Sequence, residues 1–173
     1  MLQGDMAMSY LEDLERLQAQ LTGFVSENPE YDKDRRHILF VYGTMKRGLR
    51  NHARLAKARF LGEAITRGDC YLMWTKQVPG TTKLAPVLTP DGTFRIRGEL
   101  YEVDGDILSN IDLCEGHPVV YERFQVDVDL VAPFQGVNRN LYGAWTYLWG
   151  AHSEQKLTRK GVQLTGDVME FAP

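Results

Sequence analysis

Apolar and polar residues follow two different periodicities along the chain, first a helical one and then that of β-strands. Over residues 7–26, apolar side chains recur every three or four positions and charged side chains fill the other face, which predicts an amphipathic helix. Residues 26–36 are polar and contain Pro29, so we interpret them as a linker. We expect the apolar face of the helix to pack on its own domain; the alternative is a surface for a homodimer or another partner.

From residue 37 onward, short runs bounded by turn residues predict strands. Residues 38–42 form a continuous apolar run, which is typical of a strand buried on both faces. Pro90-Asp91-Gly92 predicts a turn, and residues 50–58 predict a short helix. Further strands are expected at residues 60–74, 84–89, 94–100, 124–130 and 140–149.

A second clear helix is predicted at residues 104–115. Asp104 is suited to cap its first turn, because its side chain can accept a hydrogen bond from a free backbone amide. Gly116 and Pro118 are residues that end helices.

Many strands with few helices predict an α+β fold. We expect a small mixed β-barrel or curled sheet with flanking helices and an N-terminal helical extension. The expected organisation is a helix and linker at residues 1–35, a barrel domain at 36–150 and a C-terminal tail at 151–173. The sequence of the tail leaves its structure ambiguous.

Composition narrows the classes of function. The net charge of −3 gives no global basic field for nucleic acid or for an anionic membrane. No apolar run is long enough to span a bilayer and the N-terminus lacks a signal-peptide pattern, so we expect a cytoplasmic protein. Cys70 and Cys114 lack metal-ligand spacing, although a disulfide between them stays open. The four histidines are scattered, and no metal is expected.

Glu115 is the first candidate for chemistry, because it ends the predicted helix on its apolar side. Ile107, Leu108, Ile111 and Cys114 form the apolar stripe, and Glu115 follows it by helical spacing. Burial and the negative end of the helix dipole both raise the pKa of a carboxyl in such a place, which suits proton transfer. The alternative is a frayed last turn with the carboxyl in water.

The second candidate is the segment Tyr42-Gly43-Thr44-Met45, directly after the first strand. Glycine lets backbone amides approach a ligand closely, and such amides bind a carboxylate or stabilise an oxyanion. A glycine after a strand is also the pattern of a simple turn.

Three further features each have two interpretations. The basic residues between 46 and 59 form either a nucleic-acid patch or, as we favour, a solvated helix face without interleaved aromatic residues. Tyr121 and Arg123 lie opposite the apolar face that holds Phe124, so they face solvent or turn toward a pocket. His117 is either part of an acid–base pair or, as we favour, an exposed loop residue.

Three segments together resemble the gamma-glutamylcyclotransferase-like family. Residues 40–48 (FVYGTMKRG) and then Asn51-His52 resemble its opening strand and loop, where Met45 replaces the usual leucine. Residues 98–103 (GELYEV) resemble its central strand, and residues 111–116 (IDLCEG) resemble the segment with the catalytic glutamate. The match looks closest to the gamma-glutamylamine cyclotransferase branch.

The resemblance covers roughly residues 37–149 and implies a compact β-barrel and a reaction without a cofactor. In that reaction the substrate's α-amino group attacks its own γ-carbonyl, which leaves 5-oxoproline and releases an amine or amino acid. The family implies Glu115 as general acid and base, the residue 43–45 loop as the anion site, and Tyr42 and Tyr121 as pocket lining. The expected partner is a small gamma-glutamyl amine or peptide; the alternative is a catalytically idle binding module of the same fold.

Overall fold

The computed structural model of the chain describes residues 29–68, 71–78, 80–132, 140–150 and 156–173. The helix predicted over residues 7–26, and with it the dimer surface, lies outside the described residues, as does Cys70.

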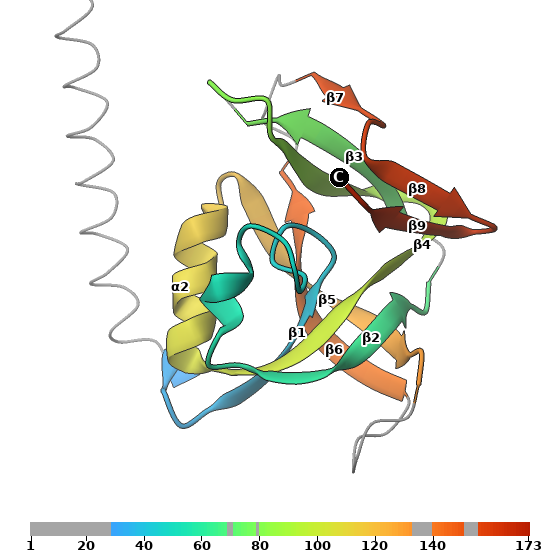
Figure 1. Cartoon of the computed structure of the whole chain (residues 1–173). Helices are drawn as coiled ribbons and strands as arrows, with labels where there is room; N and C mark the ends of the chain where they lie inside the picture. Colours follow the sequence, from blue (N-terminus) through green and yellow to red (C-terminus); the bar gives the residue numbers. More distant parts are fainter. Residues whose placement is uncertain (1–28, 69–70, 79, 133–139, 151–155) are drawn as a thin grey trace, which may run out of the picture.

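Strands make up most of the described chain (Figure 1). They are β1 (Arg36–Val41), β2 (Arg59–Thr66), β3 (Tyr71–Gln77), β4 (Leu84–Asp104), β5 (Tyr121–Leu130), β6 (Asn140–Trp149), β7 (Leu157–Thr158), β8 (Val162–Thr165) and β9 (Val168–Phe171). One α-helix, α2 (Gly105–Glu115), and two 3₁₀ turns, η1 (Pro29–Tyr31) and η2 (His52–Leu55), complete the described elements. None of the described helices is long and apolar enough to cross a membrane.

The strands belong to one connected sheet. Its hydrogen-bonded neighbours run in the order β1-β6-β5-β2-β4-β3-β7, and β4 also pairs with β1. The pairings β1-β6-β5-β2-β4 therefore return to β1. Most pairs are antiparallel, whereas β1 with β6 and β4 with β9 are parallel. The helix α2 and the β8–β9 hairpin lie on opposite sides of this arrangement (Figure 1).

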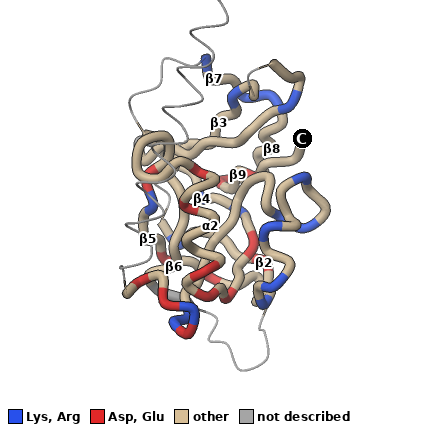
Figure 2. Tube along the Cα trace, turned by 90° about the vertical axis from the view of Figure 1, so that its left-hand side faces the viewer, with Lys and Arg blue, Asp and Glu red and all other residues tan. Residues whose placement is uncertain are grey.

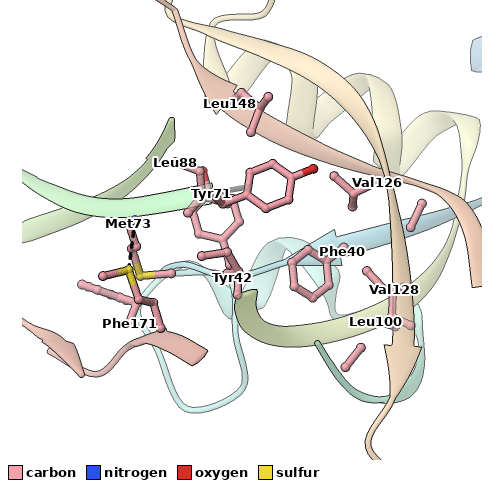
Figure 3. Packing of buried hydrophobic residues seen from close by; sticks show 14 of the residues in the cluster. Phe40, Tyr42, Tyr71, Met73, Leu88, Leu100, Val126, Val128, Leu148 and Phe171 are labelled. Carbon is pink, nitrogen blue, oxygen red and sulfur yellow. Dashed lines mark hydrogen bonds between the residues drawn. The ribbon is translucent and has the colours of Figure 1, made fainter. Parts of the chain in front are cut away.

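The strand β1 is buried on both faces, as its continuous apolar run predicts. Phe40 belongs to one apolar cluster, whereas Leu39 and Val41 belong to a second cluster on the other face. Figure 3 shows Phe40 and Tyr42 among apolar side chains that come from several strands. Burial on both faces fixes the end of β1, and hence the start of the loop that follows it.

The turn predicted at Pro90-Asp91-Gly92 is wrong, because the chain continues through it as one long strand, β4. Leu72 pairs with Thr89 and Tyr71 pairs with Phe94, so residues 90–93 form a bulge between two registers. Such a bulge bends a strand without reversing it. The first part of β4 therefore pairs with β3 and the second part with β2 and β1.

Two other local predictions also need correction. The short helix expected over residues 50–58 is a single 3₁₀ turn, η2. On β5, Phe124 is 48% exposed while Tyr121 is 7% exposed, the reverse of the predicted alternation. The buried face of β5 changes parity along the strand, since Val126 and Val128 are buried further on.

The helix α2 has the bounds that its sequence predicts. The Asp104 carboxylate accepts a hydrogen bond from the Ile107 amide at 2.8 Å, which is an N-cap. Gly116 ends the helix in the left-handed conformation, with φ of 65°. The apolar stripe differs in one member, because Cys114 is exposed and Asp112 is buried instead.

The C-terminal residues, which the sequence leaves ambiguous, add strands to the sheet. The strand β9 pairs with β4 and β8, and Met169 and Phe171 on it are buried in an apolar cluster. The Met73 amide donates to the Met169 sulfur at 3.4 Å, and Figure 3 marks this bond by a dashed line at Met73.

A pocket between the first loop and the end of the helix

A pocket opens where the loop after β1, the β3–β4 hairpin and the C-terminus of α2 meet, with a volume of about 240 Å³. Every residue that the sequence predicts for the site lies in its wall: Tyr42, Gly43, Thr44, Met45, Glu115 and Tyr121. Residues that the sequence analysis does not assign to the site also line it, among them Arg50, Lys76, Pro86, Cys114 and Tyr147.

The loop after β1 is closed by its own hydrogen bonds. The Lys46 amide donates to the Gly43 carbonyl at 3.0 Å, and the Asn51 amide donates to the Thr44 carbonyl at 2.9 Å. The Asn51 side-chain amide also donates to the Thr44 hydroxyl at 2.8 Å. Among the described residues, the backbone amides of residues 43–45 donate no hydrogen bond, and these three residues line the pocket.

Two carboxylates attach this loop to the sheet, Glu99, which is buried, and Glu170, which is half-buried. Glu99 of β4 accepts from the Arg47 amide at 2.9 Å and from the Tyr101 hydroxyl at 2.8 Å. The Lys46 ammonium, which is 10% exposed, pairs with Glu170 of β9 at 2.6 Å. Glu99 is 8% exposed, although a carboxylate is ordinarily found on the surface. Its burial makes sense because it satisfies donors of the loop.

The structure also bears on the basic residues between 46 and 59, for which the sequence leaves open a nucleic-acid patch or a solvated helix face. Arg47 lies over the Phe60 ring at 3.7 Å, and Arg50 donates to the Leu84 carbonyl at 2.8 Å. Arg54 contacts the Cys114 sulfur. The segment is solvated, as we favour, since its basic residues are exposed except for Lys46; the expected helix, however, is only the 3₁₀ turn η2. In the view of Figure 2, basic residues are spread over several loops and strands, with acidic residues between them.

The Glu115 carboxyl is half-buried and faces the pocket. Burial raises its pKa to about 7, Lys76 and Arg54 nearby lower it, and Asp112 raises it again. No described Lys, Arg or His side chain makes a salt bridge with Glu115. The carboxyl is therefore poised to gain and lose a proton near neutral pH, because desolvation outweighs the cations around it.

The two tyrosines predicted for the site are both buried, and their hydroxyls bind the pocket wall. Tyr42 donates to the Tyr147 carbonyl at 2.6 Å, and Tyr121 donates to the Pro86 carbonyl at 3.3 Å. Burial raises the pKa of both hydroxyls, and the Glu115 carboxylate raises the pKa further. The rings are therefore neutral lining. The alternative that Tyr121 faces solvent is wrong.

Asp112 and Arg123 fix the position of the last turn of α2. The Arg123 guanidinium, whose side chain is 7% exposed, pairs with Asp112 at 2.7 Å and with Glu30 at 2.6 Å. Asp112 also accepts from the Tyr147 hydroxyl at 2.6 Å and from the Tyr31 hydroxyl at 2.7 Å. The helix that carries the carboxyl of the pocket is thus connected to β5, β6 and η1.

His117 and Cys114 lie close to Glu115 in the sequence and are further candidates for a function. The His117 ring nitrogen Nδ1 accepts from the Arg123 amide at 3.0 Å, so the ring stabilises the turn after α2. It is half-buried and does not line the pocket. Cys114 is a free thiol at the wall of the pocket, and Cys70 lies outside the described residues.

Lys76 is the residue that sequence reasoning missed. It lies beyond the strand predicted over residues 60–74, in a segment expected to be a polar loop, whereas β3 continues through it. The alternation of Tyr71, Met73 and Thr75 with the residues between them indicates that the strand continues, but it does not indicate that Lys76 lines a pocket. Within the described ranges, no three His, Cys, Asp or Glu side chains gather as a metal site.

Comparison with known proteins identifies relatives over much of the described sheet. A family profile described as gamma-glutamyl cyclotransferase, AIG2-like, matches residues 39–167. A Drosophila melanogaster protein provisionally named a gamma-glutamylcyclotransferase is 43% identical over 94 residues, which cover 50% of this chain and 57% of that protein. This chain thus spans less than two thirds of that relative. The gamma-glutamylaminecyclotransferase of Rattus norvegicus is 29% identical over 128 residues, covering 63% of this chain and 78% of the rat protein.

Solved structures share the fold. The crystal structure of an AIG2-like protein from Mus musculus matches with a TM-score of 0.57 and 24% identity. The match covers 69% of this chain and 80% of the mouse chain. At this identity the likeness concerns the arrangement of strands and helix.

Proposed function

The chain belongs to the gamma-glutamyl cyclotransferase, AIG2-like family, and we propose that it cyclises a small gamma-glutamyl amine or peptide to 5-oxoproline. The observation that carries the proposal is the position of Glu115. Its carboxyl, with a pKa raised to about 7, lines the same pocket as the backbone of residues 43–45. Relatives named gamma-glutamylaminecyclotransferase agree with an amine as the leaving group. As scaffold we propose the predicted β-barrel, which the return of the pairings from β4 to β1 supports.

The proposed reaction needs one group that takes a proton and gives it back. The Glu115 carboxylate removes a proton from the substrate's α-amino group, whose nitrogen then attacks the γ-carbonyl carbon. The protonated carboxyl next donates to the nitrogen of the scissile amide. That C–N bond breaks, which leaves 5-oxoproline and a free amine, and Glu115 returns to its starting state. A pKa near 7 suits both halves of this cycle.

The loop of residues 43–45 is proposed to bind the negative charge of the substrate. These residues line the pocket and their amides have no backbone partner among the described residues, so we propose that the amides bind the glutamyl carboxylate or the oxyanion of the tetrahedral intermediate. Since the ring closure is intramolecular, holding the substrate in a folded-back conformation supplies much of the rate. Tyr42 and Tyr121 would provide the walls against which the substrate folds.

Direct detection of 5-oxoproline tests the proposal. We expect the purified chain to release it from gamma-glutamyl amines or gamma-glutamyl amino acids without any added cofactor. A panel that varies the leaving group and keeps the glutamyl part constant will identify the preferred amine. If no member of the panel yields 5-oxoproline while several bind, the chain is the catalytically idle module of the same fold.

A further inference from the structure

Lys76 places an ammonium group in the pocket at a position determined by β3. It pairs in register with Ala85 on one side and with Leu157 on the other. The preceding residue, Thr75, faces the opposite side, where its hydroxyl donates to the Lys160 carbonyl at 2.7 Å. Alternation along the strand therefore directs Lys76 toward the pocket, which it lines.

Two aromatic rings hold this ammonium. The Nζ atom is 3.9 Å from the centroid of the Trp149 ring and 5.0 Å from that of Tyr121. The two rings pack edge to face at 5.1 Å. Aromatic faces attract and orient a cation, yet they do not replace the oxygen acceptors that its N–H groups have in water.

The chain supplies no counter-ion to Lys76 among the residues that the structure describes. No carboxylate of this part lies within 4.0 Å of its nitrogen. Glu115 acts on it from a greater distance, because each group changes the pKa of the other without an ion pair. Burial lowers the pKa of the Lys76 ammonium, and the Glu115 carboxylate opposes this. A half-buried cation without a paired anion is a place where an anionic ligand group is stabilised.

We propose that Lys76 determines specificity by binding a carboxylate on the leaving amine of the substrate. This inference rests on the proposed function and adds the residue that selects, among its substrates, those whose leaving group is an amino acid or peptide over those that release a neutral amine. The loop of residues 43–45 follows β1, whereas Lys76 lies on β3, so one pocket can hold the glutamyl carboxylate and a second anion.

The experiment compares two substrates that differ only in that carboxylate, gamma-glutamyl-alanine and gamma-glutamyl-alaninamide. For the parent chain we expect kcat/KM to favour the carboxylate by about tenfold or more, the usual value of a charge-assisted hydrogen bond. In Lys76→Met the ratio should fall to about one, mainly through KM. Lys76→Arg keeps the charge and should keep most of the preference.

The ratio of kcat/KM for the two substrates separates binding of the carboxylate by Lys76 from any change in the pKa of Glu115. Removing Lys76 changes the pKa of Glu115 for both substrates alike, so this effect cancels in the ratio. Lys83→Met is the matched control, because Lys83 is exposed on the same β3–β4 hairpin, does not line the pocket and carries the same charge. It should keep the parent ratio. Lys76→Gln serves as a second variant should Lys76→Met fail to fold.

Different results would contradict the role of Lys76 and the proposed function. If both substrates release 5-oxoproline at equal kcat/KM, or if Lys76→Met leaves the ratio unchanged, the role of Lys76 is wrong while the proposed function stands. If Lys83→Met changes the ratio of the two kcat/KM values as much as Lys76→Met does, the preference reflects the overall charge of the chain, and the role of Lys76 is wrong. If neither substrate releases 5-oxoproline, the proposed function fails, and this inference with it.

Discussion

At the residue scale, Glu115 differs from an ordinary surface glutamate in the balance of forces on its charge. Burial disfavours the carboxylate, and Lys76 and Arg54 recover only part of that cost, so its pKa rises to about 7. The sequence predicts the direction of this shift from the place of Glu115 at the end of an apolar stripe. It does not predict the cations, because they come from β3 and from the segment after β1.

The raised pKa has a direct consequence for the pH dependence of the proposed reaction. The carboxylate form must take the first proton, so kcat/KM should rise with pH through about 7 and then level off. Lys76→Met removes a charge that lowers the pKa of Glu115, so the midpoint of this rise should move to higher pH. The profile is measured with a neutral gamma-glutamyl amide. A midpoint between about 4 and 5, the ordinary range of glutamate, contradicts this assignment.

Gly43 is the second residue whose identity the pocket requires. A Cβ atom built on it lies 2.7 Å from Cγ of the Pro86 ring, and both residues line the pocket. The ring has little freedom to move away, so a larger side chain must displace the loop or the β4 wall.

We expect Gly43→Val to fold and to lose substrate affinity by about tenfold or more, while Gly43→Ala loses less. Isothermal titration with a slowly converted gamma-glutamyl amide gives the affinity, and circular dichroism verifies the fold. Affinity equal to that of the parent in the valine variant would remove the loop from the binding site.

At the element scale, the helix α2 shows what local sequence decides and what it leaves open. Asp104 and Gly116 are cap residues by their own chemistry, so both ends of the helix are predicted correctly. The burial of Asp112 is not predicted by the sequence. A carboxylate can be buried in the apolar stripe only because it pairs with Arg123, which lies in a different element. The long strand β4 escaped prediction for a similar reason, since Pro90 and Gly92 occur in turns and in bulges alike.

The contact between Asp112 and Arg123 predicts that α2 depends on a buried ion pair. Asp112→Asn leaves the Arg123 guanidinium with Glu30 alone and should lower the free energy of unfolding by about 3 kcal/mol. Asp106→Asn, an exposed change on the same helix, should cost less than about 1 kcal/mol. Urea denaturation measures both. Equal effects of the two substitutions would mean that the buried pair is not what holds the helix.

At the scale of the whole molecule, the pocket is completed by segments far apart along the chain. Lys46 of the first loop pairs with Glu170 of the last strand, and Glu30 before β1 pairs with Arg123 of β5. These long-range pairs leave no periodic pattern in the sequence. This explains why the sequence indicates the central strands and the candidate site residues, but does not predict that the C-terminal residues form strands of the same sheet. The predicted division at residues 35 and 150 stays a prediction.

Two truncations test whether the segment before β1 supports the molecule. A chain that starts at Pro29 keeps Glu30 and Tyr31, whereas one that starts at Asp34 loses their contacts with Arg123 and Asp112. We expect the shorter chain to keep its fold but to have a lower free energy of unfolding, by about 2 kcal/mol. Thermal and urea unfolding of the two chains measure the difference. Identical stabilities would show that these contacts contribute nothing.

The central claim is that the Glu115 carboxyl transfers the proton, and the substitution Glu115→Gln tests it most directly. Glutamine keeps the shape of the side chain but cannot accept the proton. Single-turnover release of 5-oxoproline should therefore slow by about 10²–10⁴-fold while substrate affinity stays within about threefold. Glu122→Gln, an exposed change of the same charge on β5, should retain the parent rate. Turnover by Glu115→Gln at the parent rate would contradict the mechanism.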